Sequence, residues 1–144
     1  MHPAYGAGHA TSAGACVTIL KAFLNERYPW PGRVVVPDRD GTSLVDYTGP
    51  DAGALTIGGE LDKLAANIAL GRSAAGVHWR SDYTEAVRYG EGVALAVPRE
   101  HSILFNETGH FTVESFDGRT LRIERGELED VTERSSPPSH TTAV

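Results

Sequence analysis

Residues 58–72 read GGELDKLAANIALGR, and this stretch decides the fold. Its apolar side chains recur every three or four residues, which is the spacing of one face of an α-helix, while Glu60, Asp62 and Lys63 lie away from that face. The next position of the apolar stripe is Arg72. The stretch therefore predicts an amphipathic helix that packs on other helices and carries a permanent positive charge inward near its end.

Two further segments have the same periodicity. The first runs from about Gly8 to Arg27 and should end at the prolines and glycine of residues 28–32. The second runs from about Trp79 to Val97, where Pro98 is expected to end or kink the helix and residues 103–105 could add a last turn. Three amphipathic helices predict a mainly α fold built as part of a helical bundle.

The remaining segments are less regular. Residues 28–57 are predicted to form an irregular surface excursion, with a short extended segment at 34–36 that runs into a turn. Residues 111–124 alternate around Asp117-Gly118 and predict a short C-terminal β-hairpin. Residues 127–144 are acidic and then rich in serine and proline, which is typical of a disordered tail. Residues 1–126 are therefore expected to form one domain.

Composition excludes several classes of protein. The 144 residues carry a net charge of −6, which argues against a nucleic-acid partner. The only cysteine, Cys16, can form neither an intrachain disulfide nor a zinc-binding pair. We find neither a transmembrane stretch nor a secretory signal, so we expect a soluble chain without membrane contact and leave its localisation open.

Two polar residues fall on apolar helix faces. Arg72 would need a carboxylate or a bound oxyanion if it points inward, although an arginine near a helix end can also extend to solvent. His9 follows the loop Gly6-Ala7-Gly8 at a helix start, where free backbone N–H groups suit an oxyanion. The alternative for His9 is an ordinary core histidine after a turn.

His78 and Asp82 lie four residues apart and would share one helix face. A carboxylate in that position can fix the tautomer of the imidazole, as a metal ligand or a nucleophile requires. A plain surface pair is the alternative. His101, His110 and His140 have no comparable setting, and we expect them on the surface or in turns.

The order and spacing of these residues add a resemblance. Residues 2–10 read HPAYGAGHA and residues 71–82 read GRSAAGVHWRSD. Together the two motifs resemble the signature shared by vanadium-dependent haloperoxidases and type 2 phosphatidic acid phosphatases (the PAP2 superfamily). Residues 11–23, 61–72, 83–92 and 116–123 look like the C-terminal region of the bromoperoxidase branch. His2, seven positions before His9, is similar to bromoperoxidases, whereas chloroperoxidases tend to have an aromatic residue there.

The resemblance implies a vanadate cofactor, with phosphate possible as an isostere. His78 would be the ligand of the vanadium, Arg72 and the Gly8 amide would bind its oxygens, and His9 would act as acid and base. His2 would tune His9 or the halide position, Asp82 would support His78, and Ala7 stands where many members have a serine. The implied reaction is peroxidase chemistry, the oxidation of bromide by hydrogen peroxide to hypobromous acid or an equivalent.

One part of the family pattern is missing from this sequence. The family has an upstream lysine and an arginine followed by proline, and nothing of that kind precedes His2. We therefore expect weak or absent vanadate binding by this chain alone, and association either with a missing N-terminal half or with further copies of the chain. The alternatives are a phosphatase in which His78 attacks phosphorus, and a non-catalytic helical module for oligomer assembly.

Overall fold

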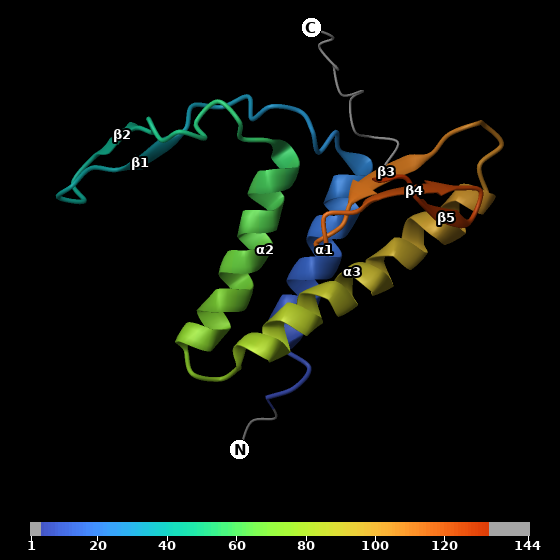
Figure 1. Cartoon of the computed structure of the whole chain (residues 1–144), viewed down its shortest axis with the longest axis horizontal. Helices are drawn as coiled ribbons and strands as arrows, with labels where there is room; N and C mark the ends of the chain where they lie inside the picture. Colours follow the sequence, from blue (N-terminus) through green and yellow to red (C-terminus); the bar gives the residue numbers. More distant parts are fainter. Residues whose placement is uncertain (1–3, 133–144) are drawn as a thin grey trace, which may run out of the picture.

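The computed structural model describes residues 4–132, in which three helices form the body of the molecule (Figure 1). They are α1 (Gly8–Phe23), α2 (Ile57–Ala74) and α3 (Arg80–Ile103). Helix α1 packs against both of the others, most extensively against α3. The mainly α fold expected from the sequence is confirmed. No helix within residues 4–132 combines the length and the apolar character needed to cross a bilayer.

Small side chains let the helices approach closely. A Cβ added to Gly14 of α1 would collide with the backbone carbonyl of Val87, and one added to Gly90 of α3 would collide with that of Thr11. The core consists mainly of alanines in two clusters. The cluster at the start of α1 contains Ala7, Ala10, Ala69 and Ala86, with Tyr83 and Val87 packed against it. The other contains Ala13, Val17 and Ala65, flanked by Leu61 and Phe116.

Helix α3 is longer than the sequence indicated. It continues through Pro98 to Ile103, so of the two expectations for this proline, an end or a kink, the end is wrong. Proline lacks the N–H of one helical bond, but Pro98 is fully buried and its packing offsets that loss. The start of α3 is fixed by Asp82, whose carboxylate accepts a hydrogen bond from the Trp79 backbone N–H at 2.9 Å.

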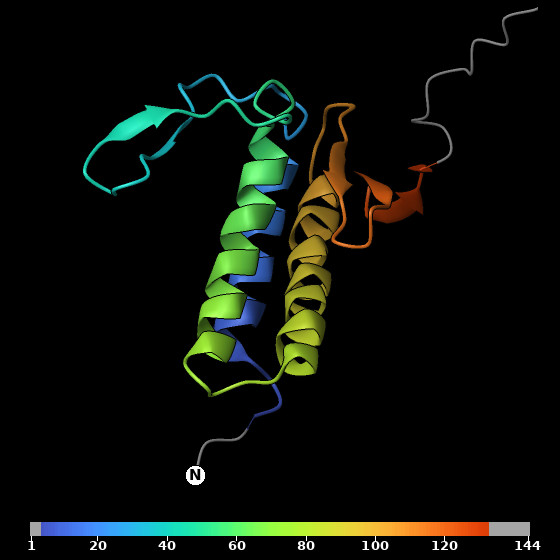
Figure 2. The ribbon, with the colours of Figure 1, turned by 60° about the vertical axis from the view of Figure 1, so that its left-hand side comes forward.

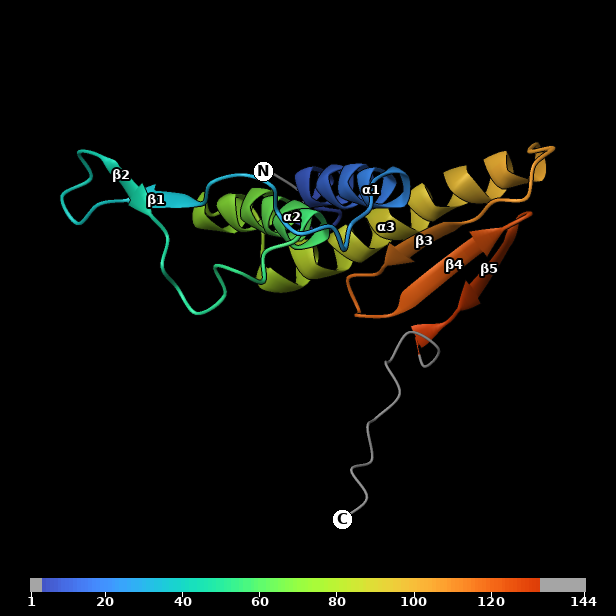
Figure 3. The same cartoon turned by 90° about the horizontal axis from the view of Figure 1, so that it is seen from above.

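A three-stranded antiparallel sheet lies beside α3, on the opposite side of the molecule from the strands β1 (Val35–Pro37) and β2 (Leu44–Asp46) (Figure 3). Its hairpin, β3 (Phe111–Glu114) and β4 (Thr120–Glu124), agrees with the expected one. A third strand, β5 (Glu127–Asp130), pairs with β4, so the disordered tail predicted from residue 127 is wrong for residues 127–130. Arg125 and Gly126 both have positive φ and form the two-residue turn that joins these strands. Residues 133–144 of that predicted tail lie outside the described part.

Residues 28–57 form an arm that projects beyond α2 (Figure 2). The extended segment predicted at 34–36 agrees with β1 (Val35–Pro37), but the chain after the turn, predicted to be irregular, forms β2 (Leu44–Asp46) and closes a hairpin with β1. The carboxylate of Asp38 stabilises its turn by accepting hydrogen bonds from the Thr42 backbone N–H at 2.8 Å and the Ser43 hydroxyl at 2.7 Å. At its base, Trp30 N–H donates to the Leu55 carbonyl at 2.8 Å and Ile57 N–H to the Tyr28 carbonyl at 3.0 Å.

A buried charge cluster joins the helices to the sheet. The Lys21 side chain, 2% exposed, donates to both carboxylate oxygens of Asp62 at 3.0 and 3.1 Å and lies 3.6 Å from Glu26. Glu26 accepts from the Glu114 N–H at 2.6 Å, and Glu91 accepts from the Phe116 N–H at 2.8 Å. Burial raises the pKa of Glu26, Asp62 and Glu91, because the charged form of a carboxyl is disfavoured away from water.

Candidate anion-binding site

The motif residues come from three element ends that meet at one end of the bundle. The start of α1, the end of α2 and the start of α3 converge there (Figure 1). Gly8 is the first residue of α1, Arg72 is in the last turn of α2, and Asp82 is in the first turn of α3. His78 lies in the short connection between α2 and α3. The expected site residue His2 lies outside the described residues.

His78 is held by the chain segment that precedes α1. Its Nδ1 atom lies 2.7 Å from the backbone carbonyl oxygen of Ala4, and its side chain is 3% exposed. Because a carbonyl can only accept, Nδ1 carries the proton and the lone pair of the neutral ring is on Nε2. This bond fixes both the tautomer and the orientation of the imidazole, as expected of a histidine that acts as a ligand.

Asp82 contributes differently from the sequence interpretation. Its Oδ2 atom is 3.8 Å from His78 Nδ1, which is too long for a hydrogen bond, and it accepts the Trp79 N–H instead. The residue that bonds Nδ1 is Ala4, through its main chain. Asp82 therefore positions the start of α3, which begins two residues after His78.

The Arg72 side chain points inward, as the apolar periodicity of α2 predicts. Its Nε atom is buried and has no hydrogen-bond partner among residues 4–132, and the same is true of the neighbouring Ser73 Oγ. A buried cationic donor without a partner is costly. Arg72 Nε and Ser73 Oγ are thus the buried side-chain atoms within residues 4–132 that lack a hydrogen-bond partner.

A pocket of about 560 Å³ opens at this end of the bundle. Ala4, Ser73 and His78 line it, and Arg80 contributes a cationic side chain. Gly76 ends the turn after α2 with a φ of 72°, a conformation that glycine adopts without strain. The pocket therefore joins a buried imidazole, an unpaired hydroxyl and positive charge.

His9 faces a different hollow. It is exposed in the first turn of α1 and lines a shallow pocket between α1 and α2 together with Gly8, Ser12 and Ile68. Ala7, by contrast, is completely buried in the alanine core. The structure thus brings His9 to the same end of the bundle as His78 but does not place the two in one pocket.

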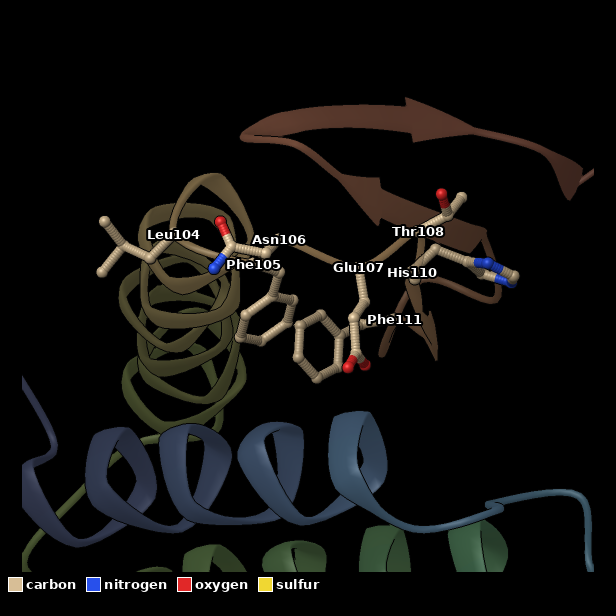
Figure 4. Close-up of a pocket in the computed structure, with 8 residues that line it drawn as sticks. Leu104, Phe105, Asn106, Glu107, Thr108, His110 and Phe111 are labelled. Carbon is tan, nitrogen blue, oxygen red and sulfur yellow. The ribbon is translucent and has the colours of Figure 1, made fainter.

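Another pocket lies at the far end of α3, in the connection to β3 (Figure 4). The rings of Phe105 and Phe111 lie side by side there, with centroids 6.0 Å apart, and His110 points away from them. No group of three or more histidine, cysteine, aspartate and glutamate side chains that could hold a metal ion occurs within residues 4–132. Neither feature involves the motif residues.

Sequence reasoning missed two parts of the site. Ser73 lies four positions after the buried Ala69, so helical periodicity could have placed it inward with Arg72. The Ala4 carbonyl has no signature in the sequence, because any residue has one.

Comparison with known proteins identifies the protein family to which this chain belongs. Residues 1–107 match the family described as the VCPO second helical-bundle domain. The chain therefore belongs to this family of vanadium-dependent haloperoxidase domains, which confirms the resemblance seen in the two motifs.

Its curated relatives are bromoperoxidases. The chain is 47% identical over 122 residues to the vanadium-dependent bromoperoxidases of Corallina officinalis and Corallina pilulifera, covering 85% of this chain and 20% of each relative. It is 36% identical over 127 residues to the vanadium-dependent bromoperoxidase of Ascophyllum nodosum, covering 85% of this chain and 22% of that relative. The chain thus spans about a fifth of the length of these relatives, whose names state a dependence on vanadium.

Proposed function

We propose that this chain supplies one wall of a vanadate-dependent bromoperoxidase site, in which bromide is oxidised by hydrogen peroxide to hypobromous acid or an equivalent. The observation that carries the proposal is the buried Arg72 Nε, which has no partner among the described residues. A tetrahedral oxyanion such as vanadate fits this atom, because its negative oxygens accept charge-assisted hydrogen bonds from arginine.

His78 would hold the vanadium through Nε2. The bond from Nδ1 to the Ala4 carbonyl supports this role, since it leaves the ligating lone pair on the other nitrogen. Bound vanadate would supply Lewis acidity toward peroxide. Arg72 would bind its oxygens, with the Gly8 N–H at the start of α1 as a further donor.

His9 would hold and move a proton at its imidazole nitrogens. Its exposure supports this role, because the ring can exchange protons with solvent and with a bound reactant. We propose that His2 tunes His9, and that Asp82 acts by fixing the chain that follows His78.

The chain by itself would bind vanadate weakly, because it supplies only some of the charged donors that an oxyanion with several negative oxygens accepts from. Further cationic donors would come from the rest of a longer protein or from other copies of the chain. The exposed apolar residues Leu64 and Ile68 on α2 support such an association, since faces of this kind are usually covered.

The test is bromination of a phenolsulfonephthalein dye by the purified chain with orthovanadate, bromide and peroxide. We expect slow bromination that requires vanadate and is lost in His78→Ala. It should persist in His101→Ala, the matched control, because His101 is an exposed histidine in the last turn of α3. Vanadate binding by the same variants is measured by equilibrium dialysis.

Hydrolysis of p-nitrophenyl phosphate is followed in parallel. Phosphate release that depends on His78, without bromination, would support the PAP2-type phosphatase in place of this proposal. If the chain shows neither reaction and no saturable vanadate binding, the non-catalytic oligomerisation module is the better description.

A further inference from the structure

Ser73 differs from other helical hydroxyl residues of this chain. Thr18 donates to the Gly14 carbonyl at 2.8 Å, and Thr84 donates to the Arg80 carbonyl at 2.9 Å. This backward bond is the usual way in which a helix accommodates a hydroxyl. Ser73 Oγ is buried and has no such bond, nor any other partner among residues 4–132. A buried hydroxyl in that state indicates a ligand that completes it.

The ligand would lie in the pocket at the end of α2, because Ser73 lines that pocket. Arg72 and Ser73 follow the fully buried Ala69 by three and four residues, so both continue the inward face of α2. Ser73 also lines the pocket that His78 lines. Arg72 itself does not line this pocket, but its unsatisfied Nε belongs to the residue directly before Ser73 on the same helix face.

The charge on Arg72 selects the chemistry of the ligand. A water molecule would satisfy the hydroxyl, but the buried cationic Nε–H of Arg72 is stabilised far better by a negative acceptor. An anion with several oxygens can accept from both atoms at once, which a halide ion, with its single atom, does less well. The pair therefore fits a tetrahedral oxyanion.

We infer that Ser73 is a further anion-binding residue, whose hydroxyl donates a hydrogen bond to the vanadate or phosphate held by Arg72. This inference rests on the proposed function, because it uses the same anion. It adds a neutral donor, a residue of the second motif to which the family resemblance assigned no role.

The experiment measures anion binding by the full chain, without turnover. Orthovanadate and, separately, inorganic phosphate are titrated to tens of millimolar, and binding is followed by equilibrium dialysis and by the rise in melting temperature. Ser73→Ala should weaken binding about tenfold, the effect of losing one hydrogen bond to a charged group. Ser73→Thr, which keeps the hydroxyl, should bind within about threefold of the wild type.

Asn67→Ala is the matched control, because Asn67 is an exposed polar residue on the same helix. It should bind both anions as the wild type does. If Ser73→Ala does not fold, Ser73→Cys makes the same comparison, since a thiol is a weak donor of similar size.

The outcomes separate the two proposals. Wild-type affinity in a folded Ser73→Ala or Ser73→Cys would overturn the role of Ser73 and leave the proposed function standing. Absence of saturable binding by the wild-type chain would overturn both. Weaker binding in these variants, with affinity retained in Ser73→Thr and Asn67→Ala, supports the inference.

Discussion

The backbone of Gly90 in α3 lies directly against the carbonyl group of Thr11 in α1, so closely that no side chain fits between them. Gly14 of α1 makes the same kind of approach to the carbonyl of Val87. These two contacts set the distance between α1 and α3 and hence the position of the N-terminal turn of α1 relative to His78.

Gly90→Ala should lower the free energy of unfolding by about 3 kcal/mol, because the added methyl group forces the two backbones apart. Gly92→Ala is the control on the same helix. A Cβ at Gly92 meets nothing within 4 Å, so the better helix propensity of alanine should raise stability by about 0.5–1 kcal/mol. Urea denaturation measures both, and equal effects would show that the close approach is unimportant.

Lys21→Ala should destabilise the chain by about 3 kcal/mol, because it leaves the carboxylates of Glu26 and Asp62 without their buried cation. Lys63→Ala, which removes an exposed lysine paired with Glu60, should leave stability unchanged within error. The readout is again chemical unfolding. A small effect of Lys21→Ala would mean that the cluster contributes little to joining the helices and the sheet.

The buried carboxyl group of Glu91 should make the free energy of unfolding depend on pH. Burial raises its folded-state pKa above the ordinary value of 4.5, so the folded chain binds this proton more tightly than the unfolded chain. Its contribution to stability is therefore fully present below about pH 4.5 and is lost as the pH rises through the folded pKa.

Glu91→Gln removes this titration while its amide oxygen can still accept from Phe116 N–H. The fall in unfolding free energy from about pH 4.5 upward should be smaller in this variant than in the wild type. Glu100→Gln, a change of an exposed residue on the same helix, should leave the pH profile unaltered. If the unfolding free energies of all three proteins depended on pH in the same way, the raised pKa assigned to Glu91 would be contradicted.

In the absence of any anion, Ser102→Ala should lower stability, whereas Ser73→Ala should not. Ser102 Oγ donates to the Arg99 carbonyl and accepts from the Gly126 N–H, both at 2.9 Å, so Ser102→Ala should cost about 1–3 kcal/mol. Ser73→Ala removes a hydroxyl that has no partner among residues 4–132, so it should leave melting temperature unchanged or raise it. Thermal unfolding measures both. A large loss in Ser73→Ala would show that its hydroxyl is bonded within the chain.

The sequence was sufficient where the structural signal is local. The three helices follow from apolar spacing and the β3–β4 hairpin from Asp117-Gly118. Strand β5 was missed because all four of its residues are exposed and it lacks the alternation that identifies a half-buried strand. Its turn residue Gly126 was a visible signal, although the preceding Arg125 is unusual at positive φ.

Features that depend on distant contacts could not be predicted. Lys21 is buried because Asp62, 41 positions away, supplies its counter-charge. In the candidate site, the inward position of Arg72 follows from periodicity, whereas the bond from His78 to Ala4 joins residues 74 positions apart. The separation of His9 from the His78 pocket likewise depends on how α1 and α2 pack.

The paired backbone bonds at the base of the arm have a consequence for how this protein can vary. Because Trp30 is bonded to Leu55 and Tyr28 to Ile57, the chain enters and leaves the arm at a closed neck. Lengthening the segment beyond that neck adds loop entropy that grows only slowly with length. The arm is therefore a modular attachment, which can acquire new sequence while the helices on either side of His78, with Arg72 in the first of them, keep their register.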